Sequence, residues 1–449
     1  MSDVTLRHRL AAHAVGGRFR LLVSGGALLA LAGAALFGWA VSGGDADRAW
    51  QLFHVNWLYF TGLAGGSVAI AAVHKITKAR WSGLVLRFAE AAVAFFPVSL
   101  LGLVLIFTVG YDHIYGPMQE QLAAIGGGKA LWLSRPWMFG RLFVGLSALY
   151  YLGWQLVRAD LLPDLADARE RAEGRRRQRY DAMLAGFDAS DAGREAHEAR
   201  INRLAPVYAV TYAMVFTLVA FDGIMALQPH WFSNLLGGFY FMGSFLGAHM
   251  LLALMVMYAG HQTGVWHLIS GKQRHDLGKL CFGFTVFWAY LMYAQFLVIW
   301  YGNLPEETGF VFARLWGTWL PVGRAVFLGM FLIPFLGLLG VTPKKFPVTM
   351  ALFASISLTA LWLERYLLVM PSVTALDGPT FGLPELGPTL LLLGLFFLVY
   401  GLFARTFPMV SPRLAERTIS AERHHAVDDH YDHDERAGDF LGDADVAKV

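Results

Sequence analysis

The chain has 449 residues, of which 56% are hydrophobic and only 15% are charged, and its mean hydropathy is +0.48. This composition is typical of an integral membrane protein rather than of a soluble domain. The formal net charge of +3 comes without a basic stripe beside stacking aromatic residues, which excludes nucleic acid as a partner. The single cysteine, Cys281, excludes a disulfide framework, a cysteine-ligated iron–sulfur cluster and a covalently attached haem.

Ten apolar runs predict an all-α protein with ten transmembrane helices. The first run is too long for a cleaved signal peptide and no small-residue cleavage site ends it, so we interpret it as a retained span. The predicted spans are 19–42, 49–75, 83–110, 135–158, 205–228, 231–260, 277–302, 314–341, 346–371 and 386–408.

The charges of the loops alternate between the two ends of these spans. One set of loops carries Arg7, Arg9, Lys75, Lys78, the arginine-rich segment 158–203, Lys344, Lys345 and Arg413. The opposite set is poor in basic residues and carries acids such as Asp112, Glu306 and Glu307. By the positive-inside rule the first set is cytoplasmic, which places both termini in the cytoplasm.

Two polar segments lie outside the predicted membrane region. The charged segment 159–203 predicts a solvated helical hairpin, with contact to lipid headgroups or a partner as the alternative. The segment 418–449 is rich in histidine and aspartate, which predicts a disordered cytoplasmic tail, with metal binding as the alternative.

Two pairs of spans resemble one another and indicate an internal duplication. Spans two and six share the pattern Tyr-Phe-x-Gly-x-x-x-Gly, at Tyr59–Gly66 and Tyr240–Gly247, and this glycine spacing permits close helix packing. Spans four and eight both open on Arg-x-Trp and continue to Gly-Arg. We therefore predict two four-helix bundles, at 43–228 and 229–371, with the peripheral first and tenth spans in 1–42 and 372–417.

Buried ionisable residues are costly in a membrane and need a partner or a function. Arg141 and Asp222 lie at matching predicted depths, which predicts an ion pair in the first bundle. Arg324 and Glu364, with the neighbouring Arg365, form the expected counterpart in the second. Both pairs either hold the bundles together or line a quinone or proton pocket that opens outward.

A second set of polar residues predicts a proton path. His249 lies deep in span six, with Tyr258 and His261 further along it, and Tyr290 and Tyr293 of the next span are expected to face His249. Glu90, one turn after Arg87, is a further candidate, and a structural role for each residue remains open. Two-haem binding is disfavoured because only one span carries two histidines at suitable spacing.

The stretch 276–307 is unusually polar for a spanning helix. Between Leu280 and Tyr301 it has no charge, yet it carries Thr285, Trp288 and Gln295 and ends on Asn303–Glu307. Such hydrogen-bonding capacity predicts a helix packed inside a bundle or beside an internal cavity.

Two motifs carry a resemblance to a known family. The segment Phe221–Asn234 and the sequence Ile-Trp-Tyr-Gly-Asn-Leu-Pro-Glu-Glu at 299–307 resemble the NrfD-like (polysulfide reductase membrane subunit) family. The likeness covers about 45–372 and is strongest to the second NrfD-like subunit of bacterial alternative complex III. One departure is that Gln228 precedes Pro229 and His230, where the family pattern has an aspartate.

The resemblance implies a subunit of a quinol-oxidising complex in the bacterial cytoplasmic (inner) membrane. It implies a quinone region near the periplasmic side in the sister subunit, a role in proton translocation for this chain, quinone or menaquinone as the molecule that the complex binds, and no covalently held cofactor or metal in this chain. Haems and iron–sulfur clusters are expected only on partners, namely a sister NrfD-like subunit, a periplasmic iron–sulfur subunit and multihaem cytochrome c subunits, with membrane lipid around them. The quinone-region candidates are Arg141, Asp222, His230, Arg324, Glu364 and Arg365.

Three functions remain open from the sequence. The first is quinol oxidation coupled to proton translocation through the second bundle. The second is a non-catalytic scaffold that anchors peripheral redox subunits. The third, a secondary transporter, is disfavoured because the spans look continuous apart from proline positions such as Pro97 and Pro334. Transporters carry broken helices at matching positions of their two halves.

Overall fold

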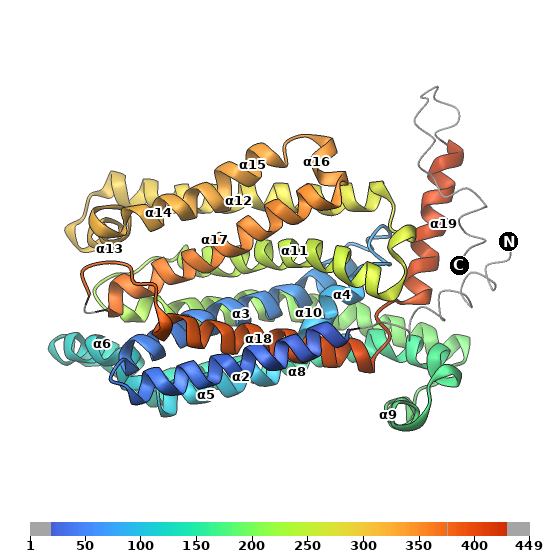
Figure 1. Cartoon of the computed structure of the whole chain (residues 1–449), viewed down its shortest axis with the longest axis horizontal. Coiled ribbons are helices and arrows are strands. Elements are labelled where there is room, and N and C mark those ends of the chain that lie inside the picture. Colours follow the sequence, from blue (N-terminus) through green and yellow to red (C-terminus); the bar gives the residue numbers. More distant parts are fainter. Residues whose placement is uncertain (1–18, 375, 429–449) are drawn as a thin grey trace.

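The computed structural model describes residues 19–374 and 376–428 of the chain. Within these ranges the chain folds into helices joined by turns, with no strand. The long helices run side by side along the long axis of the molecule (Figure 1). Nine helices of this described part are long and apolar enough to cross a membrane. The protein is therefore an all-helical, multi-pass membrane protein, as its composition predicted.

The first group of helices surrounds α3, which is buried along almost its whole length. α3 packs against α4, η1 and α5, which together form the third predicted span. It also packs against α10, and α10 packs against α8. The elements of this group are α3 (Ala46–Ile76), α4 (Leu86–Glu90), η1 (Ala91–Phe95), α5 (Phe96–Thr108), α6 (Tyr111–Ile125), α7 (Gly127–Trp132), α8 (Arg135–Ala168), η2 (Arg169–Arg171), α9 (Gly174–Leu184) and α10 (Asp191–Gly223). The helical character predicted for the charged segment 159–203 is confirmed, because α8 and α10 both extend into it.

The second group surrounds α11, which packs against α10, α12 and α17. Its elements are η3 (Met225–Leu227), α11 (Leu236–Thr263), η4 (Trp266–Leu268), α12 (Gly271–Gly302), α13 (Pro305–Leu315), η5 (Gly317–Trp319), α14 (Leu320–Phe327), the π turn η6 (Leu328–Leu332), α15 (Ile333–Gly337), α16 (Val341–Lys345) and α17 (Pro347–Val373).

α3 and α11 meet at their glycine motifs in the centre of the molecule. A Cβ atom on Gly62 would lie 2.6 Å from Ser244 Oγ, and one on Gly66 would lie 2.7 Å from the Ser244 carbonyl oxygen. The Tyr240 hydroxyl donates to the Leu58 carbonyl oxygen at 2.8 Å. Since residue numbers rise together along this contact, the two helices are parallel. Larger side chains would separate them, so the glycines permit this contact.

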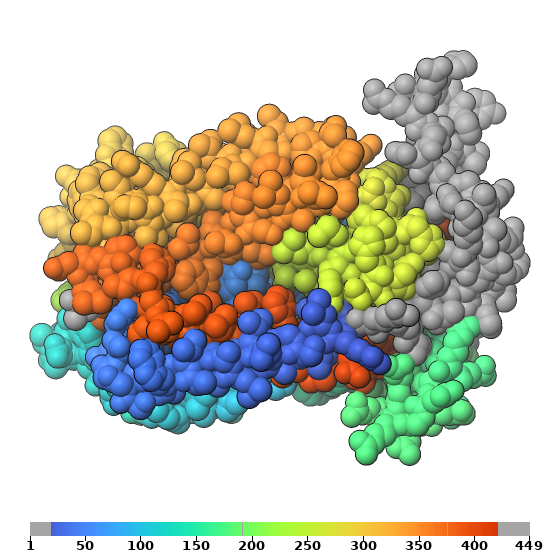
Figure 2. Space-filling model, viewed as in Figure 1, coloured from blue at the N-terminus to red at the C-terminus, as the bar shows by residue number. Residues whose placement is uncertain are grey.

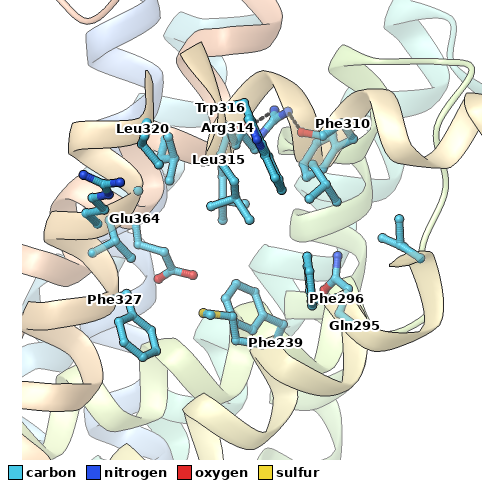
Figure 3. Close-up of a pocket in the computed structure, with 18 of the residues that line it drawn as sticks. Phe239, Gln295, Phe296, Phe310, Arg314, Leu315, Trp316, Leu320, Phe327 and Glu364 are labelled. Carbon is cyan, nitrogen blue, oxygen red and sulfur yellow. Dashed lines mark hydrogen bonds between the residues drawn. The ribbon is translucent and has the colours of Figure 1, made fainter. Parts of the chain in front are cut away.

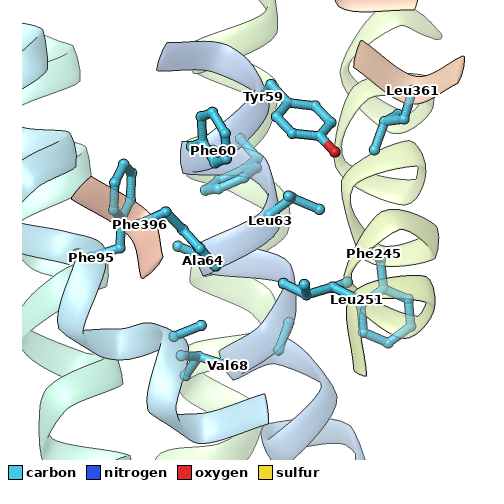
Figure 4. Packing of buried hydrophobic residues seen from close by; sticks show 14 of the residues in the cluster. Tyr59, Phe60, Leu63, Ala64, Val68, Phe95, Phe245, Leu251, Leu361 and Phe396 are labelled. Carbon is cyan, nitrogen blue, oxygen red and sulfur yellow. The ribbon is translucent and has the colours of Figure 1, made fainter. Parts of the chain in front are cut away.

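Apolar side chains fill the space around the central pair. Tyr59, Phe60 and Leu63 of α3 pack against side chains from the neighbouring helices, including Leu361 of α17 and Phe396 (Figure 4). These residues are 9% exposed or less. α17 is also joined to α3 by a hydrogen bond from the Tyr59 hydroxyl to the Leu358 carbonyl oxygen at 3.1 Å. The core therefore holds α3, α11 and α17 in a fixed register.

The first and last apolar helices form a pair on one side of the molecule. α2 (Arg20–Ser42) and α18 (Leu383–Thr406) run along each other over most of their length (Figure 2). The amphipathic helix α19 (Pro412–Asp428) then crosses one end of the bundle (Figure 1). The disordered tail predicted from residue 418 was wrong for 418–428, which continue α19, and 429–449 lie outside the described residues.

Two spans are interrupted, near the prolines that the sequence showed as exceptions to continuous spans. The third contains the 3₁₀ turn η1 just before Pro97, and the eighth is divided by an extended Trp316 and by the π turn η6 before Pro334. Proline lacks the N–H that a regular helix uses, which favours such irregular turns. The spans three and eight do not occupy equivalent positions of the predicted repeat, so the breaks do not match as they do in transporters.

Gly394→Ala should destabilise the protein, because a Cβ atom there would lie 2.2 Å from the Ala30 backbone nitrogen of α2. Overpacking of this kind costs about 1–3 kcal/mol, measurable by thermal unfolding in detergent. Gly38→Ala is the matched control, since no atom lies within 4 Å of its added Cβ. Equal unfolding temperatures of the two variants would contradict the observed contact between α2 and α18.

Candidate functional site

A cavity of about 520 Å³ lies in the second group of helices. α11, α12, α13, α14 and α17 all contribute to its wall. The wall is largely apolar and includes Phe239, Met292, Phe296, Phe327 and Leu367. The polar groups at the cavity are few, namely Trp288, Gln295, Arg314, Arg324 and Glu364. An apolar pocket with a few converging polar groups is the usual form of a small-molecule site.

Glu364 of α17 is the acid of this cavity. Its side chain is 3% exposed, and its carboxyl group points into the opening opposite Gln295 and Phe296 (Figure 3). Oε2 accepts a hydrogen bond from Arg365 Nη1 at 3.1 Å, whereas Oε1 has no hydrogen-bond partner within the described part of the chain. The Trp288 indole lies beside the carboxyl without the geometry of a good hydrogen bond. One carboxyl oxygen is therefore available to a ligand.

Arg365 fixes the position of this carboxyl against α11. Its Nη2 donates to the Tyr240 carbonyl oxygen and to Ser244 Oγ, both at 3.2 Å, and its guanidinium lies 4.3 Å from the centre of the Tyr240 ring. Gly243 leaves room for the group, because a Cβ atom there would lie 3.2 Å from Arg365 Nη2. Gly243, in the glycine motif of span six, thus leaves room for the ion pair of Glu364 and Arg365.

Arg314 is a cavity residue that the sequence analysis did not select. It is 3% exposed and has no carboxylate partner among residues 19–374 and 376–428. Its guanidinium donates to the carbonyl oxygens of Phe310 and Leu368 at 3.0 and 2.7 Å and to Ser372 Oγ at 2.6 Å, while Nε has no described partner. Arg314 is the first residue of the Arg-x-Trp motif of span eight. By itself this motif indicated only an internal duplication, not a cavity residue.

The expected pair between Arg324 and Glu364 was wrong. Arg324 lies on α14 at the exposed edge of the cavity, and Glu364 pairs instead with Arg365. The expectation assumed a regular helix from residue 314, but the chain is extended at Trp316. This break changes the direction of every later side chain relative to Arg314.

The expected pair between Arg141 and Asp222 is confirmed in the first group. Arg141 Nη2 and Nε donate to the two oxygens of Asp222 at 2.5 and 2.6 Å. The Arg141 guanidinium also lies 4.2 Å from the centre of the Trp132 ring. Both oxygens of Asp222 are therefore occupied, in contrast with Glu364.

The residues of the predicted relay do not come together. His249 is buried, with Nδ1 2.9 Å from the Phe245 carbonyl oxygen. The Tyr258 ring lies edge-on to Phe19, and its hydroxyl has no hydrogen-bond partner among the described residues. His261 is exposed and its ring stacks on Trp266. Side chains nine positions apart on a helix of 3.6 residues per turn point in opposite directions, so His249 and Tyr258 lie on opposite faces.

Three other predicted site residues face outward. Tyr290 and Tyr293 are 61% and 59% exposed, so the expectation that they face His249 was wrong. α12 lies at the edge of the bundle and turns only one face toward α11, which brings Trp288 inward and both tyrosines outward. His230 is exposed in the loop before α11 and does not line the cavity.

Glu90 belongs to a buried ionic cluster at the end of the bundle near α19. Arg87 Nη1 lies 2.7 Å from Glu90, and Arg87 Nη2 lies 3.0 Å from Asp160 and 2.6 Å from Asp164. Lys75 and Arg413 both contact Asp160 as well. Three cations thus face three carboxylates, which balances the charge and joins α3, α4, α8 and α19.

The sequence of the chain was compared with known protein families and with curated proteins. No model of a known protein family matches the chain, and no curated protein matches it. The resemblance to the NrfD-like family therefore remains a prediction from the motifs.

Arg87→Gln should reduce stability by about 3–5 kcal/mol, because it leaves buried carboxylates without their shared cation. Arg169→Gln is the matched control: Arg169 and Asp181 form an ion pair with side chains 51% and 41% exposed. Exposed pairs contribute about 1 kcal/mol or less. Chemical or thermal unfolding of the purified protein measures both, and equal losses would show that the buried cluster is not a stabilising unit.

Proposed function

We propose that the chain is a membrane subunit of a quinol-oxidising complex, and that the cavity beside Glu364 binds the quinol ring. The observation that supports this proposal is a buried carboxyl with one unpaired oxygen in an otherwise apolar cavity. The volume of about 520 Å³ lies in the range typical of small-molecule pockets, about 300–1,000 Å³. The family resemblance points to the same class of molecule.

The residues of the cavity suit the chemistry of quinol oxidation. A quinol loses two protons and two electrons as it becomes a quinone. In our proposal Glu364 Oε1 accepts the two protons one after the other and releases the first toward the outer side before the second is transferred. Arg365 holds the carboxylate in place and stabilises its charge. The indole N–H of Trp288 is available as a donor to the second oxygen of the carboxyl or to the ring. The electrons pass to haem or iron–sulfur centres of partner subunits.

The proposal includes a definite topology. We infer ten spans, the nine apolar helices together with α8, and cytoplasmic termini, from the loop charges. Glu364 and Asp222 then lie toward the outer side of the membrane, where a quinol releases its protons outward. The ionic cluster of Glu90 lies toward the cytoplasm.

Proton translocation is the second part of the proposal. His249 lies on α11 between the cavity and the cytoplasmic end, and His74 lies near the cytoplasmic end of α3; both side chains are buried. Two buried imidazoles on the two central helices supply groups that can both donate and accept a proton. Their position supports a route between the ionic cluster and the cavity.

Glu364→Gln should lower quinol turnover of the assembled complex about 10²–10⁴-fold, because the amide cannot accept the proton. Glu120→Gln, at an exposed position of α6, is the control and should leave turnover unchanged. Steady-state oxidation of a short-chain quinol by the purified complex measures both. Unchanged turnover in Glu364→Gln would refute the cavity as the reaction site, and loss of assembly would favour the scaffold function.

Leu367→Trp should reduce the quinone that remains bound after purification, because the larger side chain fills part of the cavity that Leu367 lines. Leu402→Trp on the exposed face of α18 adds the same group outside the cavity. Extraction and quantification of quinone from both variants compares them. Equal quinone content in a folded Leu367→Trp protein would place the quinone elsewhere.

A further inference from the structure

A second, larger pocket lies at the opposite end of the bundle from Asp222, where α3 ends. It measures about 700 Å³, and its wall comes from the end of α3, the following turn, α10 and α19. It shares no residue with the Glu364 cavity, and quinol oxidation gives it no role. It lies beside the ionic cluster, because Lys75 and Arg413 contribute to both.

Basic side chains dominate the charge of this pocket. Five of its residues are basic, namely Lys75, Lys78, Arg80, Arg413 and Arg417, against two acids, Glu198 and Glu416. Lys75 and Arg413 contact Asp160, and Arg417 pairs with Glu198 at 2.7 Å.

Lys78 and Arg80 have no carboxylate partner in the described part of the chain, so they are available to an anion. Lys78 also has a φ of 52°, one of two positive values among the described residues other than glycine. A lysine with a positive φ is uncommon.

Buried polar atoms in the wall lack partners. Ser82 and His74 are 1% and 6% exposed, yet Ser82 Oγ and His74 Nδ1 have no hydrogen-bond partner within the described residues. The same holds for Arg413 Nε. A buried polar atom without a partner destabilises the fold, so such atoms together indicate a ligand that completes their hydrogen bonds. A hydroxyl and a guanidinium N–H both donate, which matches an oxyanion.

The remaining wall of the pocket is apolar. Leu86, Ile201 and Leu414 line the pocket beside the basic groups. Trp81 lies edge-on to His74, with ring centres 5.2 Å apart, and tryptophan is enriched at the level of lipid headgroups. A free anion would use only the basic part of this wall, whereas a lipid would use both parts.

We propose that this pocket binds the phosphate group of an anionic phospholipid. The phosphate oxygens contact Lys78, Arg80 and Ser82, and the start of the acyl chains lies along the apolar wall. Basic pockets between membrane helices are suited to such headgroups. The lipid joins α3, α10 and α19, three elements that already meet at this pocket.

The test uses the purified full-length protein in a neutral detergent and its Lys78→Ala/Arg80→Ala double variant. Thermal unfolding is followed while phosphatidylglycerol, phosphatidylcholine or inorganic phosphate is added. We expect phosphatidylglycerol to raise the unfolding temperature of the wild-type protein, phosphatidylcholine to have little effect, and the double variant to need about tenfold more phosphatidylglycerol. Lys345→Ala/Arg405→Ala, which removes two exposed charges at the same end outside the pocket, should behave as wild type.

Three outcomes decide the proposal. A wild-type response to phosphatidylglycerol in the Lys78→Ala/Arg80→Ala variant would overturn it, as would equal weakening in the control variant. A response to inorganic phosphate as strong as that to phosphatidylglycerol would keep the phosphate chemistry but overturn the lipid as its source. Because Lys78 and Arg80 are exposed, the double variant is expected to fold, and its unfolding without lipid checks this directly.

Discussion

The close parallel contact between α3 and α11 is the constraint on which the rest of the structure depends. It exists because Gly62 and Gly66 leave no side chain between α3 and Ser244 of α11. Since α3 is buried on all sides, the other helices arrange themselves around this pair. α17 is joined to α3 by two hydrogen bonds, from Tyr59 and to Asn56, and these fix the depth of Glu364.

The two halves place an acid at the same end but treat it differently. Asp222 uses both oxygens on one arginine from a neighbouring helix, which closes the site. Glu364 shares one oxygen with the arginine next to it in the chain, and its other oxygen faces a cavity. A carboxyl group with both oxygens hydrogen-bonded to an arginine stabilises the packing of its helices. A carboxyl group with one free oxygen can still accept a hydrogen bond or a proton from a ligand. In our proposal the second group of helices, with its half-paired carboxyl, is the one that carries the chemistry.

Sequence reasoning succeeded where composition and local motifs decide the outcome. Hydropathy was enough for the membrane class, the glycine motifs marked two helices that prove to be in contact, and matching depths were enough for Arg141 and Asp222. It failed to predict which face of a helix points into the protein, as Tyr290 and Tyr293 show. In a soluble protein a hydrophobic face marks the interior, but lipid and protein interior are equally apolar, so this periodic signal is weak in a membrane. The direction in which a side chain of a spanning helix points then depends on contacts with other helices, which cannot be read from the sequence.

The interrupted eighth span shows why Arg314 and Arg324 could not be assigned from sequence. Irregular backbone is tolerated at membrane depth only where it is covered by protein or faces a cavity, and residues from α13, α14 and the start of η6 do line the Glu364 cavity. The break at Trp316 lets α13 fold back so that Arg314 reaches carbonyl oxygens of α13 and α17, while Arg324 remains at the exposed edge. A continuous helix through 314–341 would present these side chains in another order and would leave less room for the cavity. The irregular backbone and the cavity are therefore a single feature of the fold.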